Sequence, residues 1–226
     1  MTPRELKIAA ARAALGEVKS GMTLGLGTGT TAEEFVRLVG EALASGALRG
    51  LRCTCTSNKT EEQARSLGIP IHALAAIAPL DLAIDGADEI DAQLRLIKGR
   101  GGALLREKIV EQAARRFIVI ADESKFVQRL GVGVLPVEVT PFAREVLQRR
   151  FAAMDLSPVL RTRDGQPRIT DEGHHIVDIR VPQDQDIADV VTRIRDFAGV
   201  VETGFFPREA SEAIIATGKG IKRLKR

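Results

Sequence analysis

The chain of 226 residues contains no tryptophan and no tyrosine, and all its aromatic side chains are eight phenylalanines. Without Trp or Tyr, and without a recognisable nucleic-acid-binding motif, the sequence offers no stacking platform for bases. The net charge of +3 arises at the C-terminus: residues 217–226 hold five Lys or Arg and no acid, and the remainder holds 28 bases against 30 acids. A basic tail can touch a polyanion, but we expect no nucleic acid partner.

The sequence also lacks long apolar runs, and its two cysteines are badly placed for a disulfide bond. No run of 18 apolar residues occurs, so the sequence predicts no membrane span. The N-terminal segment mixes acids with bases, which is unlike a signal peptide. The two cysteines, Cys53 and Cys55, lie on one face of a strand-like run, where a disulfide between them would be strained. Two reduced thiols are typical of a cytoplasmic protein.

Short apolar runs alternate with helix-period stretches from residue 22 onward. This rhythm predicts an α/β fold, with a parallel sheet covered by helices. The expected strands are 22–27, 51–57, 80–85, 94–99 and 116–122, and the expected helices between them are 31–44, 59–68 and 103–115.

The pattern changes near residue 131. From there the order strand, helix, two strands, helix, strand predicts a smaller ferredoxin-like α+β domain inserted near the C-terminal end. A last strand at 211–218 is expected to return to the first domain. We therefore expect an α/β domain of residues 1–130 plus 205–226, and a small domain of residues 131–204.

Polar segments follow all five expected strands of the first domain. They contain glycine, hydroxyl, carboxylate or lysine groups, and they are residues 27–31, 56–60, 85–89, 98–102 and 121–125. In open parallel sheets the ligand crevice lies at the carboxyl ends of the strands. The five segments are therefore expected to converge on one site.

The segment GLGTGTT, residues 25–31, has the position of a phosphate loop between a strand and a helix. It is neither GxxxxGK[ST] nor GxGxxG, and no acid for a ribose hydroxyl follows the second strand, which disfavours a dinucleotide. Thr28, Thr30 and Thr31 supply hydroxyls that suit one phosphate group. A tight turn with a helix cap is the alternative.

The segment DLAIDGADEID, residues 81–91, holds five carboxylates. Three roles fit such a cluster: a site for a hard cation, a proton-transfer device, or a solvated turn. The residues alone leave the three open.

Four segments in order resemble ribose-5-phosphate isomerase of the A type: GTGTTA, DGADEID, KGRGGALLREK and ADESK, from residues 27, 85, 98 and 121 onward. The resemblance extends over nearly the whole chain. It implies a Rossmann-like catalytic domain, residues 1–130 plus 205–226, with a smaller ferredoxin-like domain inserted. It also implies a cofactor-free enzyme of the pentose phosphate pathway that interconverts ribose 5-phosphate and ribulose 5-phosphate. It also implies a homo-oligomer, a dimer or a tetramer.

The resemblance assigns roles to individual residues. Glu107 is expected to accept the proton, with Lys98 and Asp85 as the other catalytic groups. Lys7 resembles a lysine near the phosphate. Arg100 and Leu105 depart from the residues found in many members, glycine and threonine. The expected substrate contacts are Thr28, Gly29, Thr30, Thr31, Asp85, Gly86, Ala87, Asp88, Lys98, Gly99, Arg100, Gly101 and Lys125.

Aldose–ketose isomerisation needs a carboxylate base, a cation for the enediolate and groups that assist ring opening. On this chemistry Asp85 and Asp88 are expected to hold hydroxyls, no metal is expected, and Glu89 and Asp91 are expected in a solvated turn. Two other functions remain as alternatives. A non-catalytic sugar-phosphate sensor would not need Glu107 with Lys98, and a CoA-transferase-like enzyme would use a glutamate as a nucleophile.

Overall fold

The predicted parallel sheet is present, and the computed structural model describes all 226 residues. Its strands run in the order β15-β14-β6-β3-β1-β2, and all neighbours are parallel except β15 against β14. The strands are β1 (Thr23–Leu26), β2 (Arg52–Cys55), β3 (Leu82–Asp85), β6 (Phe117–Asp122), β14 (Glu212–Thr217) and β15 (Gly220–Lys225). The return of 211–218 to this sheet is confirmed as β14.

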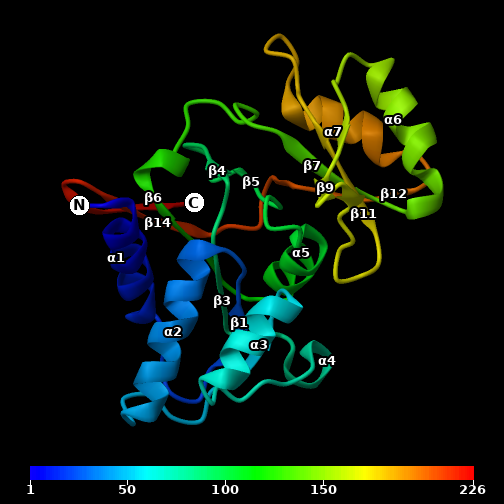
Figure 1. Cartoon of the computed structure of the whole chain (residues 1–226). Coiled ribbons are helices and arrows are strands. Elements are labelled where there is room, and N and C mark those ends of the chain that lie inside the picture. Colours follow the sequence, from blue (N-terminus) through cyan, green and yellow to red (C-terminus); the bar gives the residue numbers. More distant parts are fainter.

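Helices pack against both faces of the sheet. Strand β1 carries leucine side chains on one face and a glycine on the other, where a helix can approach closely. Leu24 and Leu26 belong to the core that α1 (Pro3–Leu15) and α2 (Thr30–Ala44) share with the sheet. On the other face, a Cβ on Gly25 would lie 2.7 Å from the Val110 side chain of α5 (Leu104–Gln112). Alpha-helices α3 (Asn58–Ser66) and α4 (Leu74–Ile77) follow β2 (Figure 1).

One strand prediction was wrong. The run 94–99 does not join the parallel sheet: β5 (Leu96–Ile97) pairs with β4 (Glu89–Ile90) and β13 (Phe205–Phe206) in a separate antiparallel sheet. Four of the five polar segments thus follow parallel strands. The fifth, from Lys98, comes from this small sheet beside them.

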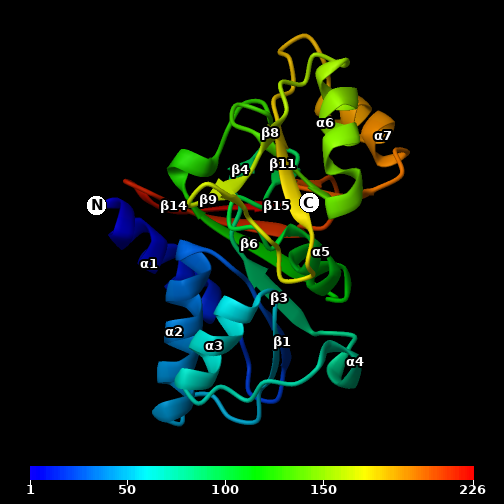
Figure 2. The same ribbon diagram turned by 45° about the vertical axis from the view of Figure 1, so that its right-hand side comes forward.

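The ferredoxin-like arrangement is confirmed by its strand order. The sheet β12-β7-β11-β8 is antiparallel throughout, with the first strand beside the fourth and the third between the first and second. Its elements are β7 (Leu135–Val139), α6 (Arg144–Ala152), β8 (Val159–Leu160), β11 (His175–Ile179), α7 (Ile187–Arg195) and β12 (Val200–Thr203). A rotated view separates this unit from α1, α2 and α3 (Figure 2).

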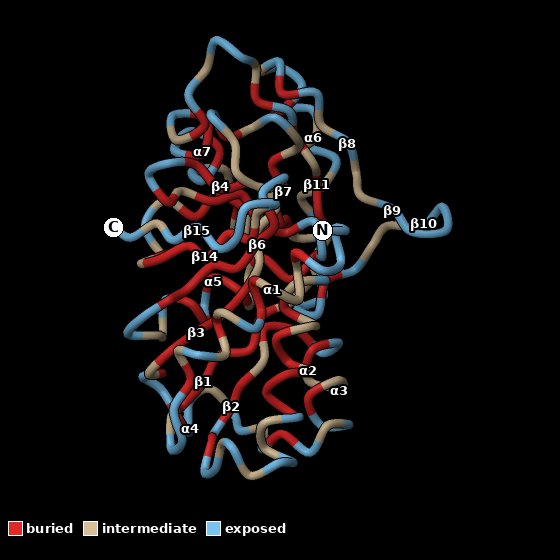
Figure 3. The backbone as a smooth tube through the Cα atoms, turned by 90° about the vertical axis from the view of Figure 1, so that its left-hand side faces the viewer, coloured by how far each residue is buried: buried red, intermediate tan, exposed pale blue.

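A hairpin of β9 (Thr162–Arg163) and β10 (Gln166–Pro167) extends from the small unit, and its tip is exposed (Figure 3). The hydrophobic core of this unit is separate from the core under α1 and α2. We propose residues 131–204 as the small domain, since all buried members of that second core lie within this range except Ile97, Leu130 and Phe205.

The basic C-terminal residues are not a free tail. They form β15, whose register pairs Glu212 with Lys225 and Thr217 with Gly220. None of the seven helices has the length and apolar character that a membrane crossing requires.

Candidate active site

A cavity of about 430 Å³ opens at the carboxyl ends of β1 and β3. In the order β2-β1-β3-β6 the chain changes direction across the sheet between β1 and β3, which is where open α/β sheets bind ligands. Only one of the sixteen lining residues is hydrophobic. Except for Asp85, every residue predicted to bind substrate lines the cavity, together with Glu107, Glu33, Lys59 and Arg168.

The loop after β1 is held by a buried carboxylate. Oδ1 of Asp85 accepts the backbone N–H of Thr28 at 2.8 Å and of Gly86 at 2.6 Å. A Cβ on Gly27 would lie 2.1 Å from this oxygen, so the loop and β3 approach closely only because residue 27 is glycine. Gly29, at φ 113°, then turns the chain into α2. The free N–H groups of the first turn of α2 suit an anion.

The three threonines of this loop have different tasks. The hydroxyl of Thr28 contacts those of Thr56, Ser57 and Thr60 at 2.7 to 3.0 Å, so it connects the ends of β1 and β2. The hydroxyl of Thr30 accepts a hydrogen bond from Lys7 Nζ at 2.9 Å. Thr31 is partly exposed at the cavity, and its hydroxyl makes no hydrogen bond within the chain.

Lys98 lies at the centre of three carboxylates. Its ammonium is 2.9 Å from Asp85 Oδ2, 3.0 Å from Glu111 Oε1 and 3.8 Å from Glu107 Oε1, and it donates to the carbonyl of Gly86 at 2.6 Å. All four side chains are at most 5% exposed. One cation among three buried carboxylates leaves an excess of negative charge, which favours protonation of a carboxylate.

The charges shift the titration of these groups. Burial lowers the pKa of Lys98, but attraction to Asp85, Glu107 and Glu111 outweighs it and the pKa rises, so Lys98 stays charged. Burial raises the pKa of Glu107 to about 8, against the attraction of Lys98 and with added repulsion from Asp85 and Asp88. Burial also raises the pKa of Glu111 well above its ordinary value.

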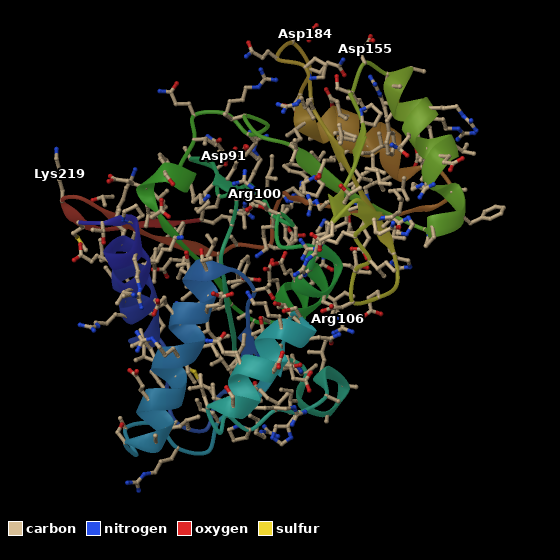
Figure 4. The ribbon with its side chains drawn as sticks, in the orientation of Figure 1. Asp91, Arg100, Arg106, Asp155, Asp184 and Lys219 are labelled. Carbon is tan, nitrogen blue, oxygen red and sulfur yellow. The ribbon has the colours of Figure 1, made fainter.

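The loop of residues 98–101 is fixed from both sides of the cavity. Oδ2 of Asp88 accepts the N–H of Arg100 at 2.8 Å. From the small domain, Arg161 donates to the carbonyl of Gly99 at 2.6 Å and Arg168 donates to that of Gly101. The Arg100 side chain, near the middle of the molecule in Figure 4, is 64% exposed, and its Nε lies 3.9 Å from Asp88 Oδ1. The backbone of this loop is therefore held while its arginine side chain remains accessible.

The prediction of a solvated turn at Glu89 and Asp91 was wrong. Glu89 is 6% exposed and accepts the N–H groups of Gly131, Val132 and Gly133. Asp91 is 1% exposed and accepts the N–H and Nε–H of Arg95. Glu89 thus caps backbone N–H groups in the connection to the small domain, a tertiary contact that a local pattern does not reveal, whereas Asp91 binds the N–H groups of Gln93 and Arg95 in the turn between β4 and β5.

Four groups of the site were not predicted: Glu33, Lys59, Arg168 and Glu111. Glu33 and Lys59 line the cavity and form an ion pair, with 2.5 Å between Lys59 Nζ and Glu33 Oε1. Because the two residues lie on different helices, no local sequence pattern predicts the pair. Glu111 had a signal, since it follows Glu107 by four residues and so shares its helix face. Arg168 reaches the site from a hairpin of the other domain.

Comparisons with known proteins agree with this geometry. The family described as ribose 5-phosphate isomerase A (phosphoriboisomerase A) matches residues 52–220. Ribose-5-phosphate isomerase A of Sinorhizobium fredii is 48% identical over 99% of both chains. A probable ribose-5-phosphate isomerase 2 of Arabidopsis thaliana is 46% identical over 98% of this chain and 87% of its own.

Solved structures show the same fold. A D-ribose-5-phosphate isomerase in complex with phospho-erythronic acid superposes with a TM-score of 0.95 at 37% identity, over the full length of both chains. Ribose 5-phosphate isomerase of Plasmodium falciparum superposes with a TM-score of 0.92 at 38% identity, over 99% of both. With the sequence relatives at nearly half identity and full coverage, these matches show that the chain belongs to the ribose 5-phosphate isomerase A family.

Proposed function

We propose that the chain is a ribose-5-phosphate isomerase that interconverts D-ribose 5-phosphate and D-ribulose 5-phosphate through an enediolate, in the non-oxidative branch of the pentose phosphate pathway. The family supports the reaction. The observation that carries the residue roles is the position of Glu107, a buried carboxylate at the cavity wall with one oxygen that makes no hydrogen bond.

Glu107 is the base in this proposal. It takes the proton from C2 of the open-chain aldose, the electrons of that C–H bond form the C1–C2 double bond, and the carbonyl oxygen on C1 becomes negative. A proton passes from the hydroxyl on C2 to the oxygen on C1, and Glu107 returns its proton to C1. The raised pKa of Glu107 suits both directions, because a base near the working pH accepts and returns a proton readily.

Lys98 stabilises the enediolate. Its buried ammonium lines the cavity 3.8 Å from the base, so its charge acts on the developing oxyanion where little water screens it. Asp85 does not line the cavity, and both of its oxygens face Lys98 or backbone N–H groups. We therefore assign Asp85 the orientation of Lys98 and of the loop after β1, and we assign substrate hydroxyls to Asp88, which lines the cavity.

The phosphate is assigned to the start of α2. Thr31 at the first turn of α2 and Lys125 both line the cavity, and Lys7 donates to the hydroxyl of Thr30 beside them. Contacts to a remote phosphate orient the reacting carbons. No step of this assignment requires a metal or a cofactor.

Purified protein tests the proposal in an assay that follows ribulose 5-phosphate formation from ribose 5-phosphate in the presence of a chelator. Exchange of the C2 hydrogen with solvent deuterium is expected to accompany turnover. Binding without turnover would favour the sugar-phosphate sensor. Acyl transfer from a CoA thioester without isomerisation would favour the CoA-transferase-like enzyme.

We also propose that the protein is a cytoplasmic homo-oligomer. Cys53 and Cys55 are free thiols, as a reducing compartment allows. Phe142 is fully exposed and Val146, four residues later, is 48% exposed, and a second subunit would cover such apolar side chains. Light scattering of the purified protein distinguishes a monomer from a dimer or a tetramer.

A further inference from the structure

The buried carboxylate of Glu111 has no role in the reaction derived above. It lies one helical turn after Glu107 on α5, its side chain is fully buried, and it does not line the cavity. A fully buried acid is costly unless it is paired or protonated, so its presence beside the reacting groups requires an explanation.

The geometry around Lys98 supplies one. Three oxygens lie within 3.0 Å of the Lys98 ammonium. The Gly86 carbonyl accepts its hydrogen bond, and Asp85 Oδ2 and Glu111 Oε1 lie at ion-pair distance without a hydrogen bond. Glu107 Oε1, at 3.8 Å, is the fourth oxygen and lies beyond hydrogen-bond distance. Glu111 thus occupies a place beside Lys98 that Glu107 would otherwise take.

The charge of Glu111 follows from its surroundings. The charged groups that face it are Lys98, Asp85 and Glu107, and Asp88 faces Glu107 from the adjacent loop. The lysine of α5, Lys108, is directed away, to Glu202 and the carbonyls of Thr203 and Phe205. A single ammonium therefore serves three carboxylates, and two Phe rings, 117 and 206, flank it.

We propose that Glu111 is a positioning residue for the isomerisation: as an uncharged carboxylic acid it holds Lys98 by one oxygen, and so keeps Lys98 from forming a close ion pair with Glu107. The inference rests on the proposed function, because it concerns the basicity of the proton acceptor. Burial, which raises the pKa of Glu111 above that of an ordinary glutamate, supports the uncharged form. A close ion pair would stabilise the charged form of Glu107 and weaken it as a base.

Two variants test the proposal. Glu111→Gln keeps the shape and the oxygen without an ionisable group, and it should retain kcat within about threefold, with the acid limb of the kcat/KM profile unmoved. Glu111→Leu fills a similar volume without a polar atom. It should lower kcat at least about tenfold, leave KM nearly unchanged, and move the acid limb toward lower pH, since Lys98 can then approach Glu107.

The Gln and Leu variants can each refute the positioning role of Glu111. A Gln variant whose acid limb moves by a pH unit would mean that Glu111 acts as a charge, and a Leu variant with wild-type kcat and profile would mean that it positions nothing; either result overturns the proposal. Thermal melting identifies a Leu variant that does not fold, in which case Glu111→Met replaces it and the Gln result still decides the charge. Wild-type protein without isomerase activity would instead refute the proposed function, so the two failures are distinguishable.

Discussion

Replacement of Glu107 by Gln should have opposite effects on activity and on stability. Gln keeps the size of the side chain but cannot accept the proton, so kcat should fall at least about 100-fold, the low end for loss of a general base. KM should change little, because the phosphate and hydroxyls are held by other groups. The variant should also stop exchanging the C2 hydrogen of the substrate with solvent deuterium.

The stability effect follows from the raised pKa of Glu107, about 8 against an ordinary 4.5. Between these values the unfolded chain releases a proton that the native protein keeps, so the free energy of unfolding falls as pH rises through this window. At pH 7 the window spans about 2.5 pH units at about 1.36 kcal/mol each, an upper bound of about 3 kcal/mol. The buried amide needs its own partners, so we expect Glu107→Gln to stabilise by about 1 to 2 kcal/mol.

Urea unfolding at pH 5 and pH 7 measures this effect, since the gain should be smaller at pH 5. Glu62→Gln is a matched control: Glu62 is an exposed acid on α3, and its replacement should alter neither activity nor stability measurably. A Glu107→Gln enzyme that isomerises within a few-fold of wild type would exclude Glu107 as the base. A variant less stable than wild type at pH 7 would refute the argument from buried charge.

Three further results are expected. The kcat/KM of the wild type should fall about tenfold per pH unit below about pH 8; a limb near pH 6 alone would be that of the substrate phosphate, whose second pKa is about 6. Thr31→Val should raise KM more than it lowers kcat, because phosphate contacts exist in ground and transition states alike, and an unchanged KM would remove Thr31 from the site. Activity should survive EDTA treatment and dialysis; restoration by Mg²⁺ or Mn²⁺ after loss would identify the acids of residues 85–91 as ligands.

The sequence predicts the site better than the path of the chain around it. The convergence of the loops after β1, β3 and β6 could be expected, because the carboxyl ends of parallel strands meet at one edge. The sheet of β5 could not, since a two-residue strand has no period to distinguish parallel from antiparallel pairing. Lys98 nevertheless reaches the expected place.

Contacts between remote segments explain the other misses. Glu89 is bound by the N–H groups of Gly131 and Gly133, and Arg168 arrives from a hairpin of the small domain. A carboxylate in a polar run has the same local pattern whether it faces water or caps a distant loop. Thr28 shows the same limit: it lines the cavity, but its hydroxyl binds Thr56 and Ser57 from the next strand end.

The anchoring of α5 has a consequence for the evolution of the fold. Lys108, next to the proposed base, donates to the carbonyls of Thr203 and Phe205, and the N–H of Lys98 donates to the carbonyl of Gly204 between them. The segment that closes the inserted domain is thus the support of both reacting groups. A descendant that lost residues 131–204 would retain the start of α2 and its anion-binding turn. It would lose the carbonyls of Thr203 and Gly204 that hold Lys108 and Lys98, so such an internal deletion would separate phosphate binding from proton transfer.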